Sequence, residues 1–133
     1  MRRFESTRAA RLRAPAGPWL DAWVAEAFAA RLTGLARVAG LPPGRGLLVP
    51  RCRSVHTVGM RFPIDVAFLS WPPVRGVCYV VAVREAVAPF RVVAPRGLPR
   101  RGAAALEAAA GTLAGIGVRR GARLNVEGVT VTA

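Results

Sequence analysis

The sequence predicts a single, mainly β domain with short helices, and three observations support this fold class. Apolar residues alternate along residues 60–68, which is the two-residue period of a β-strand with one buried face. Residues 77–83 form a continuous run rich in valine, a residue that is enriched in strands. The chain has 133 residues, 53% of them hydrophobic, which suits one domain built around one core.

The first third of the chain predicts an arm, one ambiguous segment, a helix and a short strand. Residues 1–18 are expected to be a flexible basic arm that ends in a proline-rich turn, and residues 19–133 the globular domain. Residues 19–26 fit a strand or a helix equally well. Residues 27–38 are rich in alanine and leucine and predict a short helix, which the sequence GLPPG at 40–44 ends. Residues 46–49 predict a short apolar strand.

The rest of the chain predicts further strands and contains one conflict. The strands at 64–69 and 77–83 are separated by a Trp-Pro-Pro turn, so an antiparallel hairpin is the natural pairing. Residues 90–94 predict a short strand, and residues 122–132 alternate and predict the last one. The conflict lies at residues 103–110, where an alanine-rich composition favours a helix.

The charge of the chain is strongly positive. Twenty basic residues, all of them arginine, against seven acidic residues give a net charge of +13. The arginines are scattered, with denser groups in the N-terminal arm and at 96–101. We therefore favour a solvated basic surface, with non-specific nucleic-acid binding through charge as the alternative. Charges interrupt every apolar run, so we predict no membrane span, and without an export signal we expect a cytoplasmic protein.

Several segments together resemble a known family. They are HTVGMRFPIDVAFL at 56–69, the valine-rich run after it, Pro89-Phe90-Arg91, and the sequences ALEAAAG and GIGVRRGARL near the C-terminus. The chain resembles the domain of unknown function 192 family over roughly residues 25–126. The resemblance implies a compact antiparallel sandwich or barrel-like domain and no known activity. It also implies that residues 104–109 form a strand, which we expect to bury Leu106 and to pair with the valine-rich strand.

The segment HTVGMRFPID supplies the candidate ligand-binding residues, His56, Thr57, Arg61, Asp65 and Arg91, the last from a distant strand. A carboxylate within so apolar a strand must be paired, so backbone amides or Arg91 are expected to hold Asp65 in a mainly structural role. Arg61 would lie about 13 Å away along the same strand face, too far for a direct ion pair. For His56 the alternative is a partly buried side chain that the backbone satisfies. The neighbouring residues with an expected structural role are Met60, Phe62 and Pro63.

No motif identifies a cofactor or a reaction. Cys52 and Cys78 are expected to be reduced, buried small residues. Together with His56 and Asp65 they could surround a zinc ion, but no ligand spacing supports this, so we expect no metal and no cofactor. Phosphate-binding glycine loops, paired carboxylates and serine elbows are missing from the sequence. The functions that we predict are, in order, a binding or accessory module with a polar pocket for a small polar or anionic ligand, a nucleic-acid-associated basic protein, and an enzyme of unidentified class.

Overall fold

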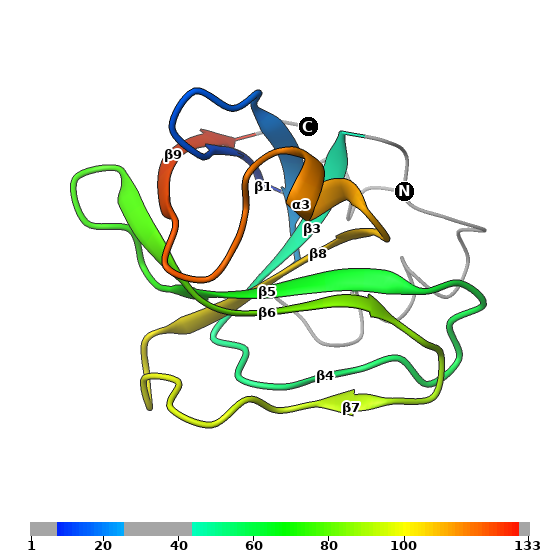
Figure 1. Ribbon diagram of the computed structural model, residues 1–133. Helices are drawn as coiled ribbons and strands as arrows, with labels where there is room; N and C mark the ends of the chain where they lie inside the picture. Colours follow the sequence, from blue (N-terminus) through cyan, green and yellow to red (C-terminus); the bar gives the residue numbers. More distant parts are fainter. Residues whose placement is uncertain (1–7, 26–43, 131–133) are drawn as a thin grey trace.

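The computed structural model describes residues 8–25 and 44–130, whose strands form a closed seven-stranded barrel (Figure 1). The barrel strands are β1 (Arg8–Arg13), β2 (Leu20–Val24), β3 (Arg45–Pro50), β5 (Ile64–Ser70), β6 (Val77–Val87), β8 (Ala103–Ala109) and β9 (Arg123–Thr130). Their order around the barrel is β1-β2-β3-β8-β5-β6-β9, and β9 pairs with β1. In Figure 1 a separate two-stranded sheet of β4 (Val55–His56) and β7 (Val92–Val93) lies below β5 and β6, and the short helix α3 (Thr112–Gly115) lies above them.

This architecture confirms the mainly β class and corrects its details. A closed barrel replaces the sandwich alternative, and closure gives every barrel strand a partner on both sides. One pairing, β2 with β3, is parallel. Within the described residues α3, with four residues, is the one helix, so the predicted short helices are overstated. The helix predicted at 27–38 lies outside the described residues. No helix in the described ranges is long and apolar enough to span a bilayer.

The hairpin predicted from the alternating and valine-rich segments is confirmed, since β5 and β6 pair antiparallel. The strands predicted at 46–49 and 122–132 correspond to β3 and β9. The ambiguous segment at 19–26 contains strand β2, and β7 is shorter than the predicted strand at 90–94.

The prediction that β5 is half-buried is wrong, because both of its faces are covered. Ala67 and Leu69 pack in the barrel interior, whereas Ile64, Val66 and Phe68 pack in a second core that includes Val55 and Val93 of the β4–β7 sheet.

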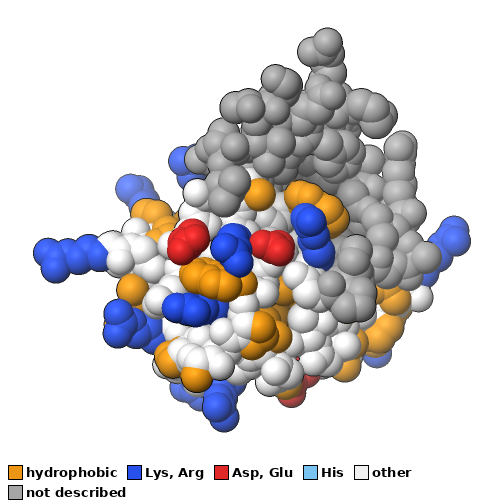
Figure 2. Space-filling model, turned by 90° about the horizontal axis from the view of Figure 1, so that it is seen from above, with side chains coloured by type: hydrophobic (Ala, Val, Ile, Leu, Met, Phe, Trp, Pro, Cys, Tyr) orange, Lys and Arg blue, Asp and Glu red, His pale blue; other side chains and the backbone are white. Residues whose placement is uncertain are grey.

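The flexible arm predicted for residues 1–18 is wrong for Arg8–Arg13. These residues form strand β1, which pairs with β2 and β9. The segment alternates small or apolar residues with arginines, so Ala10 and Leu12 are buried in the barrel. Arg11 lies 3.4 Å from Asp21 and 4.0 Å from Glu127, and its guanidinium stacks on Trp19. Figure 2 shows arginine and acidic side chains side by side on this face. The segment is rich in arginine and still forms a strand, on which Arg11 and Arg13 alternate with the buried Ala10 and Leu12.

The prediction that residues 104–109 are extended is confirmed, since β8 covers them and Leu106 is fully buried. Its partners are β3 and β5, however, and the valine-rich β6 pairs with β5 and β9 instead. Ala104 and Ala108 point into the interior of the barrel with Leu106. A seven-stranded barrel has a narrow interior, so small side chains on this strand fit by packing although their helix propensity is high.

Cys78 also lies in the barrel interior. Burial raises the pKa of its thiol to about 12, because removal from water disfavours the thiolate. The thiol is therefore protonated at neutral pH and packs as a small apolar side chain. Cys52 is half-buried, and its thiol donates a hydrogen bond to the carbonyl of Ser54 at 3.0 Å.

Candidate functional site

Asp65 is fully buried on β5 and joins three elements of the fold. The register of β5 and β6 shifts here, so that Glu85 and Ala86 of β6 lie opposite Asp65. One carboxylate oxygen, Oδ1, accepts a hydrogen bond from the amide of Ala86 at 2.9 Å. The other, Oδ2, accepts one from the amide of Leu113 in α3 at 3.1 Å. Asp65 thus connects β5 to a bulge in β6 and to the helix that inserts Leu113 into the barrel.

Ala86 shows why the bulge needs such a partner. Its φ is +49°, a conformation that alanine and other L residues rarely adopt, and its amide points at the carboxylate. Arg91, expected as an alternative partner of Asp65, forms no ion pair with it within the described part of the chain. The burial of Asp65 and its bonds to backbone amides agree with the prediction, while its structural role remains a prediction.

Thr57 is fully buried and holds residues 88–92, which we name the Phe90 loop. Its hydroxyl donates a hydrogen bond to the carbonyl of Ala88 at 2.7 Å and accepts one from the amide of Arg91 at 2.8 Å. Its own amide donates to the carbonyl of Arg91 at 2.8 Å, and its carbonyl accepts from the amides of Phe90 and Met60 at 3.1 and 3.2 Å. Every polar group of Thr57 therefore has a backbone partner.

The structure brings some of the predicted site residues together and separates others. Thr57 and Arg91 meet through the backbone of Arg91, whose side chain is exposed. His56 is half-buried in β4, where it pairs with Val92, and Arg61 is exposed in the loop before β5. Asp65 has a different set of hydrogen-bond partners from Thr57. Of the residues with an expected structural role, Met60 is buried, Phe62 is half-buried and Pro63 is exposed.

A cavity lies elsewhere, at one end of the barrel, and we name it the barrel mouth. Its volume is about 710 Å³. Its lining combines apolar side chains with two arginines and polar backbone surface; the residues are Ala9, Ala10, Val24, Leu48, Pro50, Arg51, Trp71, Pro72, Pro73, Arg101, Ala103, Val126 and Gly128. Gly128 pairs with Ala10, which is buried in the barrel, so a side chain at 128 would point toward the same interior. Among the described residues, no atom lies within 4 Å of a Cβ built on Gly128, so a larger side chain there would meet none of them directly.

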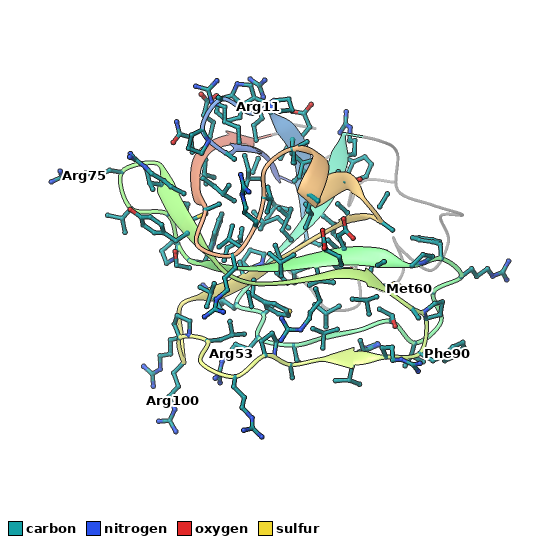
Figure 3. The ribbon with its side chains drawn as sticks, viewed as in Figure 1. Arg11, Arg53, Met60, Arg75, Phe90 and Arg100 are labelled. Carbon is teal, nitrogen blue, oxygen red and sulfur yellow. The ribbon has the colours of Figure 1, made fainter. Side chains whose placement is uncertain are left out.

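A second cavity of about 350 Å³ shares part of this lining, and we name it the arginine pocket. Its residues are Arg51, Arg53, Arg100, Arg101 and Ala103. Figure 3 shows Arg53 and Arg100 at one end of the molecule and Met60 and Phe90 at the other. Because Arg51 and Arg101 line both cavities, a charged arginine surface is continuous with the barrel mouth.

Sequence reasoning missed this cluster because it depends on a strand pairing. Pro50 at the end of β3 lies opposite Ala104 in β8, and the amide of Cys52 donates to the carbonyl of Ala103 at 3.0 Å. Arg51 and Arg53, which follow β3, therefore lie next to Arg100 and Arg101, which precede β8. The one local signal was the dense group at 96–101.

The described residues contain no group of three or more His, Cys, Asp or Glu side chains placed to hold a metal ion. Of the four residues that could have formed a zinc site, Cys78 lies in the barrel interior and Asp65 binds two backbone amides.

Solved structures with the same fold include two bacterial proteins. One, from Sinorhizobium meliloti 1021, is described as a "putative transcription regulator"; it is 22% identical, with a TM-score of 0.68 over 92% of this chain and 93% of the other. The second is a protein of unknown function from Novosphingobium aromaticivorans DSM 12444, 17% identical, with a TM-score of 0.67 over 90% of this chain and 83% of the other. At these identities the likeness shows the fold alone.

Sequence comparison gives the family. No curated protein matches the chain in sequence. The model of the domain of unknown function 192 (DUF192) family, described as "Uncharacterized ACR", matches residues 11–126. This span includes β2 to β8 and half of β1 and of β9. The chain therefore belongs to the DUF192 family.

Proposed function

We propose that this domain is a binding module that takes a small amphipathic anion at the barrel mouth. The observation that supports this proposal is the continuity of the barrel mouth with the arginine pocket through Arg51 and Arg101. An apolar or aromatic body would enter the mouth, and a carboxylate, sulfonate or phosphate group would bind the two guanidinium groups.

The mouth has the size and lining that such a body needs. A volume of about 710 Å³ lies within the range of small-molecule sites, which are mostly apolar with a few polar groups that fix orientation. Trp71, Pro72 and Val126 offer flat or aliphatic surface, and the alanines of β1 and β8 leave room beside them.

The anion would be fixed by guanidinium groups, which present planar pairs of donors that match carboxylate and phosphate oxygens. Arg51 is exposed and has a φ of +54°, a conformation that costs free energy in any residue with a Cβ. Backbone strain of this kind is concentrated at functional positions. The pocket predicted around His56, Thr57, Arg61 and Asp65 has less support, because Asp65 and Thr57 already bind backbone partners.

A pair of fluorescent probes tests the proposal. Anilinonaphthalene sulfonate is an aromatic anion, and N-phenylnaphthylamine is its neutral counterpart. Arg51→Gly should weaken binding of the anionic probe about tenfold, the value of one charge-assisted hydrogen bond, and leave the neutral probe unaffected. Gly128→Leu should weaken both probes, because its side chain would occupy open space in the mouth.

Arg75→Gly is the matched control. Arg75 is exposed, has a φ of +52° and projects from the β5–β6 turn in Figure 3, so this variant loses the same charge and relieves the same strain as Arg51→Gly. If both arginine variants weaken the anionic probe equally, general attraction to a positive protein explains the binding and the proposal fails. Native mass spectrometry of freshly purified protein would then identify whichever ligand the chain retains.

A nucleic-acid-associated function is the second candidate, and the arginine pocket is the observation that favours it. Four arginines around one hollow could contact the phosphates of a single strand. The exposed aromatic residues Tyr79 and Phe90 lie outside this pocket, so the stacking platform typical of single-strand binding is missing from its lining.

If the pocket serves the small anion, binding to a mixed-sequence oligonucleotide should be weak, independent of sequence and steeply dependent on salt. Replacing Arg53 and Arg100 by glutamine should then reduce the slope of log K against log salt by about two, one for each phosphate contact. Fluorescence anisotropy at several salt concentrations measures the slope. Tight binding that survives physiological salt and prefers one sequence would rank the nucleic-acid function first.

A further inference from the structure

Three apolar side chains are exposed around the Phe90 loop, at the end of the molecule opposite the arginine pocket (Figure 3). The exposed fractions are 53% for Val58, 68% for Phe90 and 73% for Val92. Val58 follows Thr57 directly, Phe90 donates its amide to the carbonyl of Thr57, and Val92 pairs with His56. The three residues therefore surround one buried threonine and belong to one corner of the β4–β7 sheet.

The exposure of Phe90 is built into the fold. Its φ is +62°, which is unusual for a bulky residue and costs free energy. Thr57 donates a hydrogen bond to the carbonyl of Ala88 and accepts hydrogen bonds from the amides of Phe90 and Arg91, and these bonds hold the backbone in this conformation. A loop that keeps its largest apolar side chain in water at such a cost is typical of a contact surface.

The two segments that form this corner carry only positive charges. Arg61 and Arg91 are exposed, and the sequence has no acidic residue in 51–64 or in 86–106; the exposed Glu85 lies in β6, before the Phe90 loop. A second copy of the chain, with its own charge of +13, would be repelled from such a surface. A negatively charged partner fits it.

We propose that the Phe90 loop docks on an anionic lipid membrane surface. Phe90, Val58 and Val92 would enter the boundary between head groups and acyl chains, while Arg61 and Arg91 would contact lipid phosphates. Aromatic residues favour that boundary, and arginines nearby are attracted to anionic head groups. A lipid surface requires protruding apolar groups and cations, which this corner has, whereas a protein partner would also require a matching shape.

The apolar and electrostatic contributions are both needed, because either one alone gives marginal, reversible membrane binding. The full chain should therefore sediment with vesicles of phosphatidylcholine and phosphatidylglycerol in equal parts, and hardly at all with vesicles of phosphatidylcholine. Rising salt should weaken this binding.

Phe90→Gly is the decisive variant, since glycine adopts a φ of +62° without strain and the variant should fold. It should lower the partition coefficient for the anionic vesicles about tenfold, as expected for the loss of one buried aromatic side chain. Tyr79→Ser is the control, because it removes an exposed aromatic side chain from β6 and should leave vesicle binding unchanged.

A second pair of variants separates local from general charge. Replacing Arg61 and Arg91 by glutamine should lower the partition coefficient about fivefold for each arginine. The same change at the exposed Arg75 and Arg119 removes equal charge and should have a smaller effect. The proposal is overturned if the full chain does not bind anionic vesicles, or if a folded Phe90→Gly binds them as the wild type does. Because the barrel mouth shares no lining residue with the Phe90 loop, failure of the membrane proposal would leave the proposal for the mouth standing, and the reverse.

Discussion

Replacement of Asp65 by alanine is expected to lower the free energy of unfolding by about 2–4 kcal/mol, because two backbone amides lose their acceptor. Its carboxylate is fully buried and binds the amides of Ala86 and Leu113 at 2.9 and 3.1 Å. Alanine would leave both amides without an acceptor. The buried amide of Leu113 would cost about 1–3 kcal/mol, and the part-buried amide of Ala86 would cost less because water can reach it. The bulge at Ala86 and the start of α3 would lose their connection to β5.

Asp65→Asn should be milder, because the amide oxygen can still accept one of the two hydrogen bonds while the NH₂ group opposes the other donor. Asp21→Ala is the control, since the Asp21 side chain is 55% exposed and its pairing with Arg11 is a surface ion pair worth about 1 kcal/mol or less. Urea unfolding followed by circular dichroism measures all three variants.

Unchanged stability of Asp65→Ala would contradict a structural role. Asp65 would then become the first residue to test for ligand binding, and His56 would be tested in the same experiment. A typical domain has a stability of about 5–15 kcal/mol, so the expected loss is large enough to be unambiguous.

The sequence predicts the β5–β6 hairpin and the burial of Asp65 because both follow from local pattern. Apolar alternation and a valine-rich run specify strands directly, and a carboxylate between apolar neighbours requires donors wherever they come from. The identity of those donors is not local: Ala86 offers its amide at a bulge, and Leu113 lies far along the chain in α3. The strand β8 was predicted through family resemblance, because its alanines by themselves favour a helix. Small side chains fit the narrow barrel interior, and this packing outweighs their helix propensity.

The barrel and its mouth could not be predicted, because both arise from pairing between distant segments. Closure depends on β1 and β9, at opposite ends of the chain, and β1 looks like a charged arm until its register with β9 is known. The arginine pocket likewise requires β3 to lie beside β8. Phe90 was an unremarkable aromatic residue in the sequence, and its exposure follows from a backbone conformation that Thr57 holds.

Replacement of Thr57 by valine is expected to lower the free energy of unfolding by about 2–3 kcal/mol. Valine has almost the same shape but no hydroxyl, so the amide of Arg91 and the carbonyl of Ala88 would both lose a partner. Thr57→Ser keeps the hydroxyl and loses one methyl group, which should cost about 1 kcal/mol. Thermal unfolding of both variants gives the comparison.

The same variant should release the Phe90 loop, and two measurements detect this beyond stability. Hydrogen exchange at the Arg91 amide should accelerate in Thr57→Val and stay slow in Thr57→Ser, because the threonine hydroxyl is the acceptor for that amide. The effect of Phe90→Gly on the free energy of unfolding should be more stabilising in the wild type than in Thr57→Val, by about 1 kcal/mol. In the Thr57→Val background the loop has already lost its backbone strain, so glycine has no strain left to relieve. Equal effects of Phe90→Gly in the two backgrounds, with unchanged exchange at Arg91, would show that Thr57 does not hold Phe90 in its exposed conformation.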